Sequence, residues 1–181
     1  MACKSITLRG IVQDCNGNLG GVSEVWLINR DSVSAITTAE TTVNELSGVP
    51  VISAITLATG ASFVKYFVRK NTSSMTSTLN VNDNGSTYVS TELSLVFARM
   101  DAQKRLEMNA LAKEEIAALV RDANGTWFYL GFDNPVTSSA GTGETGVQKS
   151  DANQYTATLS DESMEYPYIV LQSAIDALDL D

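Results

Sequence analysis

The chain has 181 residues, a formal net charge of -9 and no histidine. This length fits one domain with a core of its own. Without histidine the chain can build neither a Ser-His-Asp triad nor an imidazole zinc site. Its two cysteines, Cys3 and Cys15, lack CxxC spacing, so we expect reduced thiols, no metal and no cofactor. No apolar run reaches the ~20 residues of a membrane helix, and no signal-peptide pattern follows Met1, so we expect cytoplasmic synthesis and no membrane partner.

Acidic residues are concentrated late in the chain. From Asp133 onward, nine acids are opposed only by Lys149. Proteins that bind nucleic acid tightly need Lys and Arg to neutralise its phosphates and release the counterions bound there, so we expect no tight binding of nucleic acid. These acids either serve solubility alone or repel DNA phosphates from a surface that DNA passes.

The first sixty residues predict several strands. Residues 5–12 and 22–29 are expected strands, and the continuous apolar run of the second favours burial on both faces. Residues 34–46, rich in Thr, Ala and Val, lead to a predicted turn at residues 47–50. Strands are then expected over residues 51–57 and 63–70.

The centre of the chain is predicted to form a hairpin, a helix and a second hairpin. Residues 74–82 and 86–98 alternate apolar and polar side chains around an Asn-Gly turn, which predicts a long hairpin with one apolar face. Because that face needs a cover, we expect a helix to pack on it.

The predicted helix begins after Asp101, a good N-cap residue, and ends near Glu114 or Glu115. We expect Leu106 and Ala110 to face the core. Residues 116–121 and 126–130 then form the second hairpin, again around an Asn-Gly turn.

The last fifty residues combine a loop with two short elements. Residues 132–151 are rich in Gly, Ser and Thr and predict a long loop. Residues 154–160 predict a strand, and residues 168–178 a strand or a short helix. Many short strands, turn signals and one central helix indicate a single domain over residues 1–181, mainly β, either a sandwich or an open barrel of antiparallel strands flanked by the helix.

Motifs that carry chemistry are weak in this sequence. Residues 141–146 match GxGxxG by letter, but no apolar strand leads in and no helix is expected to follow. Residues 80–91 imitate a calcium loop that lacks the glutamate at position twelve. The pairs Glu114/Glu115 and Asp161/Glu162 are carboxylates of the type used in glycoside hydrolysis, with a solvated surface as the simpler explanation. We therefore predict no enzyme and no catalytic, cofactor-binding or metal-binding residues.

Trp26 and Trp127 lie in apolar strands and are expected to pack in the core. The cluster Trp127-Phe128-Tyr129 leaves open a sugar-stacking platform on a carbohydrate-binding or adhesin module, which would need these aromatic side chains to be exposed.

The order of elements resembles that of phage major tail tube proteins, and several segments resemble small virion proteins of phages that infect Bacteroidetes. The segments that carry the resemblance are residues 15–31, 66–70, 77–80, 83–88, the helix after Asp101, residues 120–125 with Gly131, and residues 151–159.

This resemblance implies a β sandwich flanked by one helix, assembled into hexameric rings that stack into a DNA-conducting tube of the virion tail. The implied partners are further copies of the chain and other tail proteins, such as the tape measure, tail terminator, baseplate or neck. Residues 32–60 are then an expected inter-subunit arm, and the acids after Asp133 line the lumen or a ring face. The alternatives are a neck, ring, tail-completion or capsid-decoration protein.

Overall fold

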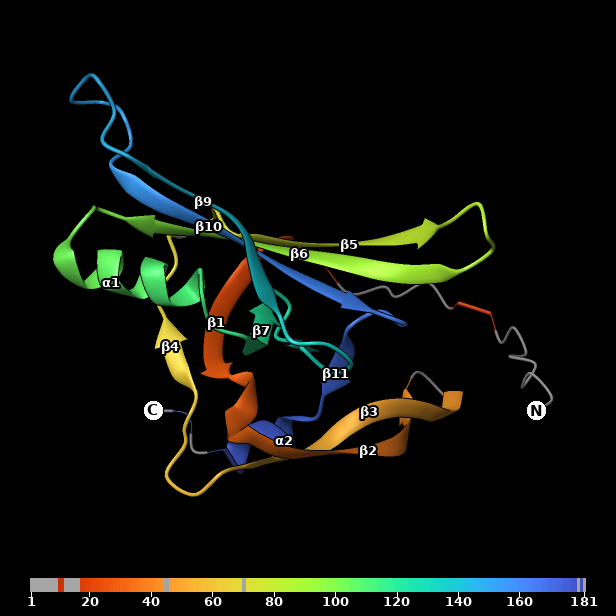
Figure 1. Ribbon diagram of the computed structural model, residues 1–181. Helices are drawn as coiled ribbons and strands as arrows, with labels where there is room; N and C mark the ends of the chain where they lie inside the picture. The colour runs from red at the N-terminus through yellow and green to blue at the C-terminus, as the bar shows by residue number, and fades with distance from the viewer. Residues whose placement is uncertain (1–9, 12–16, 44–45, 70, 179, 181) are drawn as a thin grey trace.

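The computed structural model describes residues 10–11, 17–43, 46–69, 71–178 and 180. In these ranges the chain forms two β-sheets and two α-helices (Figure 1). The expected mainly β sandwich with a flanking helix is confirmed. The larger sheet has the order β2-β3-β11-β8-β7-β1-β4, and the smaller sheet the order β5-β6-β10-β9.

The bounds of the elements are β1 (Val22–Asn29), η1 (Arg30–Ser32, a 3-10 turn), β2 (Val33–Val43), β3 (Leu46–Leu57), β4 (Val64–Tyr66), β5 (Ser74–Val81), β6 (Thr87–Ala98), α1 (Ala102–Leu111), β7 (Ile116–Asp122), β8 (Trp127–Leu130), β9 (Thr137–Glu144), β10 (Gln154–Ser163), β11 (Tyr168–Val170) and α2 (Gln172–Asp176).

The main core lies between the two sheets. Successive side chains of a strand point to opposite faces, so every second residue of β6 and β10 enters this core. Leu93, Leu95 and Phe97 of β6 are buried there, as the alternation over residues 86–98 predicts. Ala157 and Leu159 of β10 join them. Burial of these side chains holds the two sheets together and stabilises the fold by about 25 cal/mol per Å² of apolar surface that is removed from water.

A second core covers the far face of the larger sheet. β1 supplies both cores: Val25 and Leu27 point to the first, Trp26 and Ile28 to the second. The continuous apolar run of this strand predicts that arrangement. The hairpin β2–β3 and the helix α2 close the second core (Figure 1).

Both Asn-Gly turns are present, with a geometry different from the expected one. Gly85 and Gly125 have φ of 80° and 90°, while the described non-glycine residues with positive φ are Asn71 and Arg99. Each loop therefore has one left-handed residue, the glycine that follows a turn, and not two left-handed central residues. Asn82 and Ser86 close the first loop through a bond of 2.9 Å from Asn82 N–H to Ser86 C=O.

The helix α1 starts where the sequence predicts it and presents a different face. The Asp101 carboxylate accepts the Lys104 N–H at 2.8 Å. The helix ends at Leu111, before the expected Glu114 or Glu115. Leu106 is 65% exposed and Ala110 is exposed as well, so the predicted core positions of both residues are wrong. The side chains of α1 that pack against the rest of the protein include Glu107, Met108 and Leu111. Because successive residues of a helix are rotated by about 100° about its axis, Leu106 lies outside this packed face.

Three further boundaries differ from the prediction. The turn expected at residues 47–50 lies inside β3. The loop expected over residues 132–151 contains the strand β9. The strand expected over residues 63–70 is reduced to β4. Residues 168–178 form a short strand and a short helix, β11 and α2. The strand expected over residues 5–12, apart from residues 10 and 11, and both cysteines lie outside the described residues.

Candidate functional site

The outer face of the smaller sheet is open and polar. Strand alternation and the registers of β5, β6, β10 and β9 turn one set of side chains away from the core. Figure 1 shows no described element above this face. We define the outer sheet face by the residues Ser74, Thr76, Thr78, Asn80, Tyr88, Ser90, Glu92, Ser94, Val96, Ala98, Thr137, Ala140, Thr142, Glu144, Gln154, Thr156, Thr158, Ser160 and Glu162.

The charged residues of the outer sheet face are three glutamates, Glu92, Glu144 and Glu162. The rest is mainly Ser and Thr, and neighbouring hydroxyls bond across strands, as Thr142 and Thr156 do at 2.6 Å. Glu144 accepts a hydrogen bond from Gln154 at 2.7 Å. The face is thus hydrated and weakly negative, a surface that repels phosphate over a range near the ~8 Å screening length at physiological salt.

Both edges of the smaller sheet are free within the described chain. β5 and β9 each pair with one neighbour. β5 contains no charged residue and no proline, and the one charged residue of β9 is Glu144 at its end. Edge strands of monomeric proteins are normally blunted by lysine, proline or a covering segment, because their free N–H and C=O groups invite another strand. These two edges lack lysine and proline.

Asp161 is the buried acid of this sheet. It lies on the core side of β10, opposite Thr91, and is 2% exposed. Thr91 bonds Ser77 through their hydroxyls at 2.8 Å, and Asp161 accepts the Gly131 N–H. Burial, aided by the nearby charges of Asp133 and Glu162, raises the pKa of Asp161 to about 6, although the bond from Gly131 lowers it. The solvated surface expected for Asp161/Glu162 is therefore right for Glu162 and wrong for Asp161.

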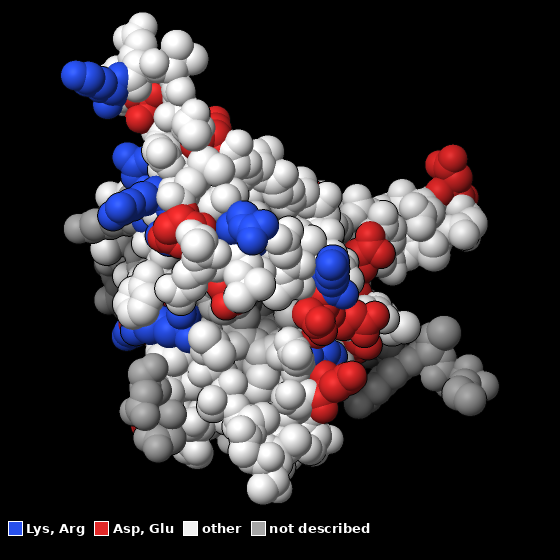
Figure 2. All heavy atoms as spheres, turned by 60° about the vertical axis from the view of Figure 1, so that its left-hand side comes forward, with Lys and Arg blue, Asp and Glu red and all other residues white. Residues whose placement is uncertain are grey.

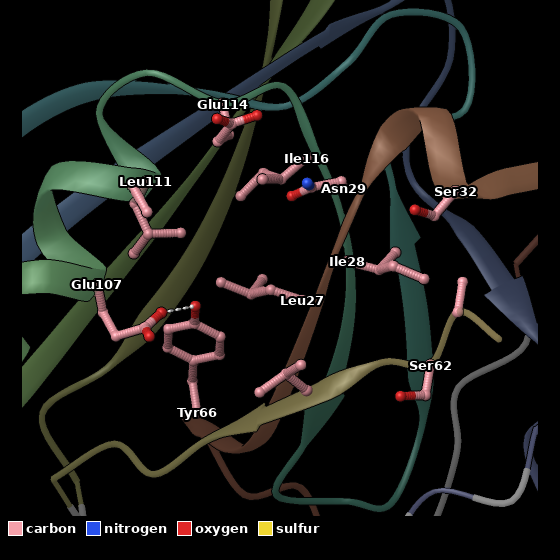
Figure 3. A pocket seen from close by; sticks show the side chains of 13 residues that line it. Leu27, Ile28, Asn29, Ser32, Ser62, Tyr66, Glu107, Leu111, Glu114 and Ile116 are labelled. Carbon is pink, nitrogen blue, oxygen red and sulfur yellow. Dashed lines mark hydrogen bonds between the residues drawn. The ribbon is translucent and has the colours of Figure 1, made fainter. Parts of the chain in front are cut away.

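A cleft of about 290 Å³ lies between α1, β1 and β4 (Figure 3). Leu27 and Leu111 form part of its apolar wall, and Glu107 and Glu114 supply its carboxylates. The Tyr66 hydroxyl donates to the Glu107 carboxylate at 2.7 Å, which ties α1 to β4. Burial and this carboxylate raise the pKa of Tyr66 far above its usual range, so the phenol stays protonated.

Replacing Tyr66 by phenylalanine is expected to lower the free energy of unfolding by about 1 to 2 kcal/mol, because the change removes one hydrogen bond to a charged group. Urea unfolding followed by circular dichroism measures the loss. Leu106→Ala on the exposed side of α1 is the matched control and should change stability by less than about 0.5 kcal/mol. A larger effect from Leu106 than from Tyr66 would contradict the observed helix orientation.

The other candidates from sequence do not assemble a site. Gly141 and Gly143 lie within β9, and the next element of the described chain is the strand β10, so no helix N-terminus directly after them can receive a phosphate. The calcium-like residues 80–91 form the end of β5, the tip of the β5–β6 hairpin and the start of β6. Trp127 and Tyr129 are 5% and 1% exposed, so they pack in the second core and offer no sugar-stacking platform. Within the described ranges, no three Asp, Glu or Cys side chains are grouped closely enough to hold a metal ion.

No family model, no curated protein and no solved structure matches this chain. Among the described residues, neither α1 nor α2 has the length and apolar character that crossing a membrane requires.

Proposed function

We propose that this protein is a structural subunit of a phage tail tube, in which copies join side by side into rings and the rings stack around a channel for DNA. The observation that carries the proposal is the outer sheet face: four strands of Ser and Thr with glutamates as its charged residues, bounded by two free edges. Such a face can line a wet channel through which a polyanion moves without binding.

Strand directions support closure of the sheet by repetition. β5 is antiparallel to β6, β6 to β10, and β10 to β9. β9 of one copy is therefore antiparallel to β5 of a neighbour in the same orientation. Continuing the sheet in this way satisfies the free groups of both edges and produces a head-to-tail ring.

The size of such a ring fits a channel. Six copies, the number that the tail tube resemblance implies, give roughly 24 strands at a spacing of ~4.8 Å, hence a width of roughly 37 Å between strand centres. Closed sheets of about 16 to 18 strands already enclose an aqueous channel.

Negative-stain microscopy of the purified chain tests the proposal, and we expect rings and tubes. Replacing Leu79 by proline should abolish them. Asn82 and Ser86 form a hydrogen-bonded pair. Hydrogen-bonded and non-hydrogen-bonded pairs alternate along an antiparallel ladder, so the pair of Leu79 with Val89, three positions away, is non-hydrogen-bonded. The Leu79 N–H therefore points away from β6, to the free edge of β5. Proline at this position removes an edge donor and leaves the bonds to β6 in place.

Leu79→Ala is the matched control, because it shortens the same side chain and keeps the N–H. We expect Leu79→Ala to assemble and the two variants to unfold at similar temperatures. A wild-type chain that stays monomeric at high concentration, or tubes formed by Leu79→Pro, would contradict the proposal. Rings that never stack would favour a neck, ring or tail-completion protein of the virion.

A further inference from the structure

Two asparagines of the described chain, Asn84 and Asn124, are each followed by a glycine. Asparagine in this position can lose its side-chain amide without an enzyme, because glycine has no Cβ to hinder attack by its own backbone nitrogen on the asparagine side chain. Both glycines have positive φ, and the N–H of each donates to the carbonyl three residues earlier, at 2.9 Å for Gly85 and 3.2 Å for Gly125. The two backbones are thus alike, and a difference in reactivity has to come from the asparagine side chains. Asn16, which also precedes a glycine, lies outside the described residues.

The Asn84 side-chain carbonyl is polarised by its neighbours. Its Oδ1 accepts two hydrogen bonds from Ser86, from the N–H at 3.0 Å and from the hydroxyl at 2.7 Å. The first bond is an Asx turn, which folds the side chain back along Gly85. The Ser86 hydroxyl accepts the Asn82 side-chain amide at 3.0 Å, which leaves its own hydrogen for Asn84. Two donors on a carbonyl oxygen stabilise the negative charge that forms there when a nucleophile adds to the carbon.

The amide nitrogen of Asn84 is open to water. The bonds of this side chain within the described part of the chain all go to its oxygen, so Nδ2 can leave without breaking a contact. Residues 81–87 are exposed, and the β5–β6 tip that contains them projects from the body of the protein (Figure 1). Figure 2 shows the same tip reaching outward on the right, with an acidic side chain at its end. A Cβ at Gly85 would have open space around it, so no neighbouring group crowds the reacting atoms.

The Asn124 amide is held at both of its polar atoms. Its Oδ1 accepts the Leu19 N–H at 2.8 Å, and its Nδ2 donates to the Leu19 carbonyl and to Asn18 Oδ1, both at 3.0 Å. A longer bond of 3.4 Å joins Nδ2 to the Asp122 carboxylate. Loss of the amide would replace this donor by an oxygen that faces three other oxygens, which leaves all of them without a partner. Reaction at Asn124 therefore has to break bonds that Asn84 does not make.

We propose that Asn84 is a site of spontaneous deamidation in the folded protein, and that the contacts of Asn124 protect it. The Gly85 nitrogen gives its proton to water or hydroxide and bonds to Asn84 Cγ, the Cγ–Nδ2 bond breaks, and Nδ2 takes up a proton and leaves as ammonia. Water then opens the cyclic imide on either side, which gives aspartate or isoaspartate, the latter with an extra main-chain carbon. The sum is one water consumed and one ammonia released. Either product adds a negative charge beside Asp83, and the reaction does not depend on the proposed tail tube function.

Peptide mapping by mass spectrometry tests the site on the folded chain kept in mildly alkaline buffer. We expect the peptide that contains Asn84 to accumulate aspartate and isoaspartate at least roughly tenfold faster than the peptide that contains Asn124. In concentrated urea the contacts of both side chains are lost, and the two rates should become similar. Equal rates in the folded chain, or a faster reaction at Asn124, would overturn the proposal.

Two matched variants test the part played by the Ser86 hydroxyl. Ser86→Ala removes this donor and keeps the N–H, so deamidation at Asn84 should slow several-fold. Thr126 holds the equivalent place after Asn124, but its hydroxyl is not among the described partners of that side chain, so Thr126→Ala should leave the rate at Asn124 unchanged. Circular dichroism checks that both variants fold. A Ser86→Ala rate equal to that of wild type would overturn the role of the hydroxyl.

Discussion

Replacing Asp161 by asparagine is expected to raise the free energy of unfolding at pH 7.5 by about 1 to 3 kcal/mol. The carboxyl is buried and one of its oxygens, Oδ1, has no hydrogen-bond partner among the described residues. Burial raises its pKa from 3.8 to about 6, so ionisation at neutral pH costs stability. Asparagine has the shape of the protonated acid and can still accept the Gly131 N–H.

The sign of the pH dependence follows from the same pKa values. Between pH 3.8 and about 6 the folded chain holds the Asp161 proton and the unfolded chain has lost it. The contribution of Asp161 to stability is therefore complete below pH 3.8 and declines as the pH rises to about 6. Glu24 acts in the opposite direction: burial raises its pKa, but the bonds from Arg121 and Lys65 outweigh burial and lower it, so its contribution is lost in acid.

Urea unfolding at pH 4, 5, 6 and 7.5, values that run from just above the lower pKa of Asp161 to above the upper one, separates the two acids. The difference between wild type and Asp161→Asn should widen as the pH rises and level off above about 6. Glu162→Gln, an exposed change on the next residue with the same loss of charge, is the control for general electrostatics. A destabilised Asp161→Asn at pH 7.5 would show that the charge itself is needed.

Asp161 also shows where sequence reasoning stops. The alternation Ala157, Leu159, Asp161 along β10 places the acid on the core side once the strand is known to reach Ser163. A strand expected to end at residue 160 leaves Asp161 outside the pattern, so its burial was missed. Extending the alternation by one step would have found it.

Elements with strong local signals were predictable, and those made by distant pairing were not. The Asp101 cap and the two Asn-Gly hairpins follow from residues close in sequence. β9 has few β-forming side chains and becomes a strand by pairing with β10. Pro50 lies within β3, opposite Glu40 of β2. On the other side of β3, the parallel strand β11 pairs at Ile52 and not at Pro50, so the backbone N–H that proline lacks can be one that has no strand to bond there.

The sequence predicts that the outer sheet face is polar, but it does not predict which residues belong to this face. An excess of Ser, Thr and Asn on the outward faces of strands indicates a polar wall, and the hairpin of residues 74–98 supplies half of it. Of the acids after Asp133, Glu144 and Glu162 lie on this face, whereas Asp161 lies beneath it and Asp176 lies on α2. Which acids share a face depends on the registers of β9 and β10, which the order of residues alone does not fix.

Replacing Gly131 by alanine is expected to lower the free energy of unfolding by about 3 kcal/mol, from left-handed strain of about 1 to 2 kcal/mol and overpacking of similar size. Gly131 has φ of 93°, and a Cβ there would lie 3.2 Å from the Ala117 Cα and 3.2 Å from the Ile116 carbonyl oxygen. Both contacts are backbone of β7, which is buried between the two cores and cannot move aside cheaply.

Gly85→Ala separates the two causes. Gly85 has a similar φ of 80° and open space around it, so alanine there should cost only the strain of about 1 kcal/mol. Equal losses at the two positions would contradict the contact with β7. Because the Gly131 N–H bonds Asp161, a shift of this backbone should also weaken that bond, and Gly131→Ala should then cost more at pH 7.5 than at pH 4. Combining Gly131→Ala with Asp161→Asn should remove this pH dependence, which would place the glycine and the buried acid in one coupled unit beneath the outer sheet face.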